Sequence, residues 1–352
     1  MLYQFILGLL IALAGSLIAV FIDSPLPWML GALVLTAITK MAGLQTSSHH
    51  RMRNAGQLII GVGLGAYFTP VVLQEVGQYM GAIAAGAIFA VLLGFYGTWA
   101  ISRFGKVDAK TAYFSSPIGG AAEMSVLAEH YGGRMDLVAS AHSLRILTVV
   151  VTMSLAFRML GLGEAVPAAP SVTVDQFKLL ILLAGAAAVA LLAAKLKLPN
   201  AWVMGPMLLS ILLTSQEWSL SSVPQWMINF AQLAIGWALG DKFGPSFLKK
   251  APRFLTVVFL FTFSSILLCL GCSWVISGLT DIPLATVVLG TAPGGISEMC
   301  IMAKVLQLGV PLVTAFQVLR LFVVLMVTGP LYRHVLCKLD LFKNQEIRLV
   351  AK

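Results

Sequence analysis

Charged side chains are scarce in this sequence. Of its 352 residues only 11% are Asp, Glu, Lys or Arg, whereas soluble domains carry about 25%. Hydrophobic residues make up 59% of the chain and the mean hydropathy is +0.93, which excludes a water-soluble fold. Several apolar runs approach the ~20 residues that a helix needs to cross ~30 Å of hydrocarbon, among them 5–21, 80–101, 179–194 and 254–276. The composition predicts an all-α polytopic membrane protein.

Residues that ligate metals are also few, with 4 cysteines and 5 histidines. Cys269 and Cys272 have metal-like spacing, but no second Cys pair or His accompanies them, so we interpret them as small core residues. Copper or di-iron chemistry needs clustered His or carboxylate ligands. Only His142 lies plainly within an apolar segment, where a hydrogen-bonding role in the core is the favoured interpretation. We therefore predict no metal, no cofactor and no enzymatic activity.

Acidic residues are scarcer than basic ones, 14 against 23, and the net charge is +9. A basic balance can indicate nucleic-acid binding, but the chain has no DNA-binding motif. In a membrane protein, an excess of Lys and Arg is typical of cytoplasmic loops. The N-terminal MLYQFILGLL has no basic n-region, so we expect a retained first helix rather than a cleaved signal. The predicted partners are the lipid bilayer and a small molecule, with no nucleic acid; a homodimer is left open.

The chain contains an internal repeat, with corresponding segments 174 or 175 residues apart. PLPWMLGAL at 25–33 matches PNAWVMGPM at 199–207, and NAGQLIIGVGLG at 54–65 matches NFAQLAIGWALG at 229–240. SSPIGGAAEM at 115–124 is followed in the same register by TAPGGISEM at 291–299. A match that holds over most of each half indicates duplication. The predicted organisation is a first membrane repeat at 1–162, a linker at 163–172, a second membrane repeat at 173–340 and a cytoplasmic tail at 341–352.

Each half offers six apolar segments, and the Lys and Arg residues between them predict the topology. If all six segments crossed the membrane in each half, equivalent basic loops would lie on opposite sides. If one segment per half does not cross, most of the 23 basic residues fall on one side. The pattern therefore predicts two inverted-topology repeats, about ten transmembrane helices and two broken or re-entrant elements. Both termini are then cytoplasmic.

The fifth segment of each half carries the repeated proline and glycines, and is the predicted non-crossing element. Proline removes a helix donor and glycine permits unusual backbone angles. Paired breaks in corresponding positions indicate a transporter binding site, with helix N-termini that favour anions; a packing kink is the alternative. The predicted substrate-binding residues are Ser116, Pro117, Gly119, Gly120, Pro293, Gly294, Gly295, Arg145, Arg320, Gln57 and Gln232.

Two glutamates follow the breaks, Glu123 and Glu298. Acidic residues at membrane depth are costly and are functional by default, so we predict that they couple transport to H⁺ or Na⁺. A structural ion pair is the open alternative, because Arg145 and Arg320 each lie 22 residues after one of them. The arginines could instead bind a carboxylate or phosphate of the solute.

The duplicated G-G-x-x-E-M element with its preceding proline, the Q-L-x-I-G stretch and the L-R pair of the last apolar segment resemble the AbrB family of bacterial inner-membrane proteins. The two copies differ in the proline's position, with Pro117-Ile118-Gly119-Gly120 against Pro293-Gly294-Gly295. That family has been labelled both as a regulator of gene expression and as an ammonia monooxygenase. Its general plan is similar to that of inverted-repeat secondary transporters. We expect a multi-pass protein of the bacterial inner membrane that transports a small, anionic organic solute with H⁺ or Na⁺. The alternative is a membrane protein that affects gene expression, directly or through a solute pool.

Overall fold

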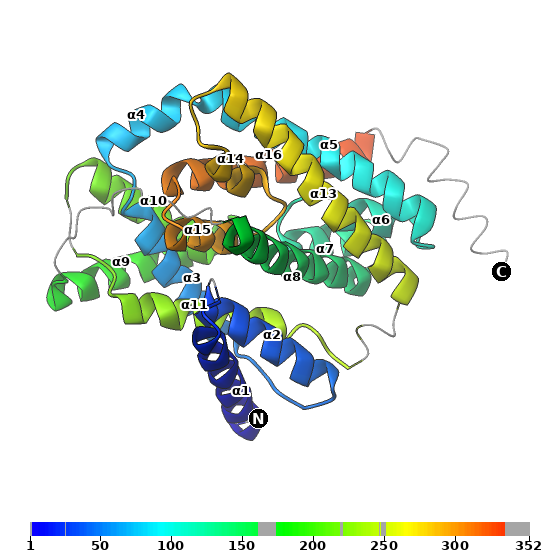
Figure 1. The fold of residues 1–352 in the computed structure, drawn as a ribbon, viewed down its shortest axis with the longest axis horizontal. Helices are drawn as coiled ribbons and strands as arrows, with labels where there is room; N and C mark the ends of the chain where they lie inside the picture. Colours follow the sequence, from blue (N-terminus) through cyan, green and yellow to red (C-terminus); the bar gives the residue numbers. More distant parts are fainter. Residues whose placement is uncertain are drawn as a thin grey trace. The chain divides into compact units, whose positions relative to one another are not determined.

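The structure is a computed structural model, and it describes residues 2–24, 26–160, 174–218, 221–245, 247 and 251–334. The predicted linker at 163–172 and tail at 341–352 lie outside the described residues. Every regular element in the described ranges is a helix (Figure 1). The predicted all-α class is therefore confirmed for this part of the chain.

The helices of the second half follow the order of those in the first. The first half contains α1 (Leu2–Phe21), α2 (Pro27–Met41), α3 (His50–Gly65), α4 (Pro70–Gln78), α5 (Met80–Phe104), α6 (Ala109–Ser115), α7 (Ala121–His130) and α8 (Met135–Leu160). The second half contains α9 (Gln176–Lys195), α10 (Ala201–Ser215), α11 (Gln225–Gly240), α13 (Pro252–Leu279), α14 (Leu284–Thr291), α15 (Ile296–Val305) and α16 (Val310–His334).

Six described helices are long and apolar enough to cross a membrane: α1, α5, α8, α9, α13 and α16. A seventh span results if α3 and α4, which meet at 88°, are counted as one broken crossing. The shorter apolar helices α2 and α10 have 15 residues each, or about 22 Å at 1.5 Å per residue. This is less than the ~30 Å of a hydrocarbon core. The multi-pass character is thus evident, while the count of ten crossings stays a prediction.

The chain forms two compact units, each built from segments of both sequence halves. Unit 1 contains 1–79, 150–246 and 296–314, and unit 2 contains 80–149, 247–295 and the residues from Ala315 onward. The two packing units therefore do not coincide with the two predicted sequence repeats.

Within unit 1, α3 packs on α10 and α11 packs on α2 through glycines. A methyl group added at Gly61 would meet the carbonyl of Val203, and one added at Gly236 would meet the carbonyl of Met29. Gly61 and Gly236 correspond in the repeat, and so do Met29 and Val203. Lipid provides no hydrophobic driving force for helix association, so helices associate through small residues that let their backbones approach closely. The same contact is therefore made twice, each time between a helix of one half and a helix of the other.

Candidate functional site

The repeated motif interrupts a helix in both halves. α6 ends at Ser115 and α7 begins at Ala121, while α14 ends at Thr291 and α15 begins at Ile296. Gly120 is the N-cap of α7, with φ −67° and ψ 133°. A proline within each break removes a backbone donor, which explains why neither helix continues. The two broken elements expected from the sequence are present.

An arginine from a long helix holds each break. Arg145 of α8 donates from its two terminal nitrogens to the carbonyls of Pro117, at 2.8 Å, and Gly119, at 3.2 Å. Arg320 of α16 donates in the same way to Ala292, at 2.6 Å, and Gly294, at 2.9 Å. In both cases the acceptors lie 28 and 26 residues before the arginine.

These hydrogen bonds satisfy carbonyl groups that the break leaves without backbone donors. Carbonyl groups at a helix end have no donor in the following turn, and burying them unsatisfied in an apolar medium costs several kcal/mol. Arg145 and Arg320 are each only 3% exposed, so their guanidinium groups supply the donors inside the protein. Bonds from a charged donor are stronger than neutral ones. The arginines thereby stabilise the broken backbone.

A second pair of side chains ties the preceding helix end to the same long helices. His142 of α8 donates from Nε2 to the carbonyl of Phe114 at 2.9 Å, and Gln317 of α16 donates to that of Leu289 at 2.8 Å. Because a carbonyl only accepts, the proton of His142 lies on Nε2 in this contact. The two residues correspond in the repeat, and each reaches the carbonyl 28 residues earlier. His142 is a core hydrogen-bonding residue, as the sequence favoured.

The two glutamates have unequal environments. Glu298, the third residue of α15, is 5% exposed, and the hydroxyl of Ser297 donates to it at 3.3 Å. No basic side chain among the described residues forms an ion pair with Glu298. Glu123, the third residue of α7, is partly exposed, and its carboxylate lies where a methyl group on Gly120 would be. An ion-coupling role for either glutamate stays a prediction.

The motif glycines do not need left-handed backbone angles. In the described chain the glycines with positive φ are Gly43 and Gly132. The motif glycines therefore do not use the positive φ that glycine permits. At Gly120 an added methyl group would meet the carboxylate of Glu123, the mobile end of a partly exposed side chain. Ser116, another predicted binding residue, is fully buried and donates to the carbonyl of Ala112 at 2.7 Å.

The predicted site residues are divided between the two units. Unit 2 contains both breaks, both arginines and Glu123, while unit 1 contains Glu298 and the two glutamines. Gln57 donates to the side chain of Asn200 at 3.1 Å. Gln232 is 2% exposed and its Oε1 has no hydrogen-bond partner within the described ranges. In the first half, the residue that corresponds to Asn200 is Leu26, whose side chain cannot form a hydrogen bond with the amide of Gln232.

Side chains of α13 connect the two breaks within unit 2. Ile118, in the first break, belongs to a buried hydrophobic cluster that includes Cys269 of α13. The thiol of Cys269 donates to the carbonyl of Thr291 at 3.3 Å, at the end of α14. Ser273, one turn further along α13, bonds to the hydroxyl of Thr291 at 2.8 Å. The structure therefore brings the two motifs to one region of unit 2.

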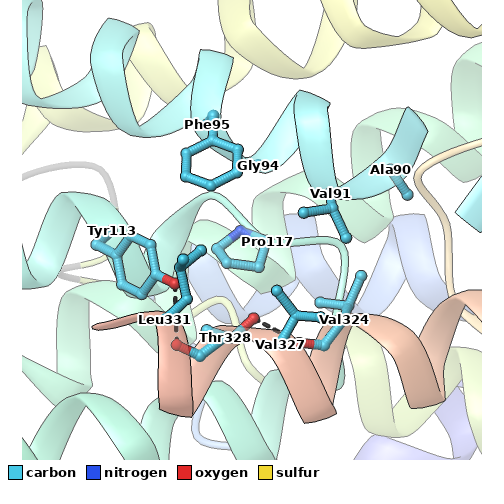
Figure 2. Close-up of a pocket in the computed structure, with 10 residues that line it drawn as sticks. All are labelled: Ala90, Val91, Gly94, Phe95, Tyr113, Pro117, Val324, Val327, Thr328 and Leu331. Atoms are coloured by element: carbon cyan, nitrogen blue, oxygen red, sulfur yellow. Dashed lines mark hydrogen bonds between the residues drawn. The ribbon is translucent and has the colours of Figure 1, made fainter. Parts of the chain in front are cut away.

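A mainly apolar cavity borders the first break, between α5 and α16 (Figure 2). Pro117 lines it from the break, and Val91 and Val324 from the flanking helices. Tyr113 donates to the carbonyl of Thr328 at 2.9 Å at its edge. Neither Tyr113 nor Thr328 was predicted, because no repeat or motif marks them. The cavity places apolar side chains beside the broken backbone.

Metal ligands do not cluster in the part of the chain that the structure describes. No group of three or more His, Cys, Asp or Glu side chains there is arranged to hold a metal ion. Cys269 and Cys272 are free thiols. The region of the breaks consists instead of backbone carbonyls, guanidinium groups and apolar side chains.

These helices define a multi-pass membrane protein with two interrupted helices, each held by an arginine. Residues 28–336 match the family described as "Transition state regulatory protein AbrB", and the chain belongs to this family, as its repeated motifs predicted. It is 29% identical over 313 residues to "Putative regulator AbrB" of Escherichia coli (strain K12), covering 87% of this chain and 88% of that protein. It is also 27% identical over 349 residues to "Uncharacterized protein YhjN" of Bacillus subtilis (strain 168), covering 92% and 91%.

Proposed function

We propose that this chain is a secondary transporter of a small, anionic organic solute, with H⁺ or Na⁺ as the coupling ion. The observation that carries the proposal is the pair of breaks in unit 2, each held by a buried arginine. Broken helices in corresponding positions of two repeats are where transporters bind solutes. The breaks place irregular backbone where polar contacts with a solute can form.

The charge near the breaks supports an anionic solute. Arg145 is buried and its hydrogen bonds go to neutral carbonyls, so within the described chain no carboxylate offsets its charge. The N-terminus of α7 adds partial positive charge near the same break.

The reciprocal packing of α3 on α10 and α11 on α2 supports the proposed inverted repeats. Exchanging the two halves converts the α3–α10 contact into the α11–α2 contact, as rotation about a two-fold axis would. With ten crossings and the second half inverted, the basic loops and both termini face the cytoplasm of a bacterial inner membrane. A cysteine introduced at position 165 would then react with an impermeant reagent from outside. Protection at 165 together with labelling at 247 would contradict this topology.

Flux into proteoliposomes tests the transport proposal. Purified protein is reconstituted with an internal pH dye or a Na⁺ dye and exposed to a panel of monocarboxylates and dicarboxylates, with and without an ion gradient. We expect at least one anion to move with the coupling ion, and flux to fall in an Arg145→Lys variant that folds. If every anion behaves as in protein-free liposomes, under both gradients, the transport proposal fails.

A role in gene regulation is the second candidate, and the name of the Escherichia coli relative favours it. We propose that such an effect is indirect and follows from a changed solute pool, because the predicted organisation has no separate signalling domain. Supplying or removing the solute in a deletion strain would then reverse the expression change. An expression change that is insensitive to the solute would favour direct regulation.

A further inference from the structure

Four basic side chains of unit 1 flank the beginnings of two helices, and we call them the basic cluster. Arg51 and Arg53 lie in the first turn of α3, while Lys195 ends α9 and Lys197 lies in the turn that leads to α10. Arg53 is partly buried and the other three are exposed. None of the four forms an ion pair with a described residue. The cluster therefore carries positive charge that this part of the chain does not offset.

The helices α3 and α10 run parallel, so their N-termini lie at the same end of unit 1. Gly61 of α3 lies against Val203 of α10, and one turn later Gly65 lies against Ser210. A helix N-terminus has unpaired backbone N–H groups and partial positive charge, which favour anions. The N-cap of α10, Asn200, makes no side-chain hydrogen bond to these groups. Two adjacent N-termini thus add to the positive potential of the basic cluster.

Two side-chain hydrogen bonds bring the basic cluster to these N-termini. Gln57 donates to Asn200 at 3.1 Å, and Asn54, with its amide oriented to satisfy both neighbours, accepts from Nε1 of Trp202 at 3.0 Å. The two arginines come just before Asn54 in the chain, and the two lysines come just before Asn200. Nε of Arg53 is shielded from solvent and has no hydrogen-bond partner in the described chain. This donor is available to a ligand with oxygen acceptors.

The acid that contacts the loop before α3 is already neutralised. Asp241, at the end of α11, accepts from the backbone N–H and the hydroxyl of Ser48 at 3.0 and 3.1 Å. The same carboxylate forms an ion pair with Lys40 at 2.8 Å, and the hydroxyl of Thr46 donates to it at 3.3 Å. Because Lys40 offsets the charge of Asp241, this acid does not compensate the basic cluster.

The repeat carries these charges in one of its two copies. The counterparts of the basic cluster are Trp226, Ile228, Phe21 and Asp23. Lys197 and Asp23 share a left-handed backbone, with φ 55° and 52°, so the turn is kept while the charge is reversed. An excess of Lys and Arg on one side is general in membrane proteins, but it does not explain their placement around two helix N-termini. The cluster is a local feature that helix packing does not require.

Exposed leucines of α9 continue directly from the basic cluster. Leu191 and Leu192 are 52% and 55% exposed and lie four and three residues before Lys195, on the same face of the helix. The helix is long and apolar enough to cross a membrane, so these side chains face the acyl chains of lipid. The surface therefore combines cations with an adjoining hydrocarbon face, which suits an amphiphile better than a free anion.

We propose that the basic cluster binds the phosphate of an anionic membrane lipid, whose acyl chains lie along α9. Arginine matches phosphate oxygens with its planar fork, and lysine binds them as a point charge. Clusters of four or more Lys and Arg at a membrane surface attract anionic lipids. The site lies on the surface of unit 1, and the inference stands whether or not the chain transports a solute.

Titration of the purified full chain in neutral detergent with dioctanoyl phosphatidylglycerol, followed by calorimetry and thermal unfolding, tests this site. Dioctanoyl phosphatidylcholine has the same acyl chains but no net charge, and glycerophosphoglycerol is the anionic headgroup without chains. We expect saturable binding and stabilisation by phosphatidylglycerol, with an affinity about tenfold higher or more than that of phosphatidylcholine. At the same concentrations glycerophosphoglycerol should not bind.

Two double variants remove opposite sides of the basic cluster. Arg51→Gln with Arg53→Gln, and Lys195→Gln with Lys197→Gln, should each weaken phosphatidylglycerol binding about tenfold or more, since two cations are lost. The lysine variant changes only exposed side chains, so it keeps the test decisive if the arginine variant does not fold. The matched control, Arg158→Gln with Lys178→Gln, removes two exposed cations elsewhere in unit 1 and should bind like the wild type.

Three results would overturn the proposal. They are equal affinity for phosphatidylcholine, wild-type affinity of the lysine variant for phosphatidylglycerol, and an equal loss of affinity in the control. Binding of glycerophosphoglycerol as tight as that of the lipid, and dependent on the basic cluster, would indicate a site for soluble phosphodiesters and contradict the lipid assignment. Because no flux is measured, failure of transport leaves this result intact.

Discussion

Replacing Arg145 with leucine should destabilise the protein by removing the donors of the first break. Two hydrogen bonds disappear, to Pro117 at 2.8 Å and to Gly119 at 3.2 Å. Bonds from a charged donor are worth about 1.5–3 kcal/mol each, so the loss is about 3–6 kcal/mol if the carbonyls find no other donor. Leucine keeps an aliphatic side chain at this position but cannot donate a hydrogen bond. Arg145→Lys should lose roughly half as much, because one ammonium group replaces a two-pronged donor.

Thermal unfolding in detergent, with hydrogen exchange of the 116–124 amides, measures this effect. Arg158→Leu is the matched control, since it lies on the same helix but is exposed and donates to a single carbonyl at 3.2 Å. Exposed substitutions usually change stability little. We expect a large drop in melting temperature and faster exchange for Arg145→Leu alone. If Arg145→Leu has the same melting temperature as Arg158→Leu, Arg145 does not stabilise the break and our reasoning is refuted.

Three further predictions follow from individual contacts. Gly61→Ala should lower stability by about 1–3 kcal/mol, as overpacking does, while Gly63→Ala, whose added methyl group would lie 3.8 Å from its nearest neighbour outside α3, should unfold like the wild type; equal melting temperatures would contradict the packing assignment. Leu26→Asn should give the buried amide of Gln232 a hydrogen-bond partner, and asparagine suits the left-handed backbone at φ 58°. The substitution should therefore raise stability more in the wild-type protein than in a Gln232→Leu background. A double-mutant cycle without coupling would show that no bond forms. Glu298→Gln should fold normally but change the pH dependence of any measured flux; an unchanged profile would mean that this carboxylate does not carry the coupling proton.

The sequence predicted the positions of the breaks well but not the partners of the charged groups. Proline and paired glycines are local signals, and both helices stop where these residues occur. The alternative of a Glu–Arg ion pair came from a spacing of 22 residues, which does not specify how two helices are rotated. In the structure Arg145 reaches carbonyls, because a broken helix has orphan acceptors that a neighbouring guanidinium can satisfy.

The number of spans was harder to predict. The segment containing α2 looked like a crossing by hydropathy, yet its 15 helical residues are short for a bilayer. Hydropathy reports composition along a chain and does not locate the ends of a helix.

The exchanged packing of unit 1 has a consequence for biosynthesis. The glycine face of α3 is completed by α10, and Gly61 and Val203 are 142 residues apart in the chain. While the ribosome makes the intervening segments, α2 packs on α1 but lacks α11, and α3 lacks α10 and α11. Contacts of such long range form slowly. The first half must therefore wait in the membrane, shielded by lipid or by the insertion machinery, until the second half emerges. Co-expressed as two separate chains, the halves should protect each other from proteolysis, and either one made alone should be degraded.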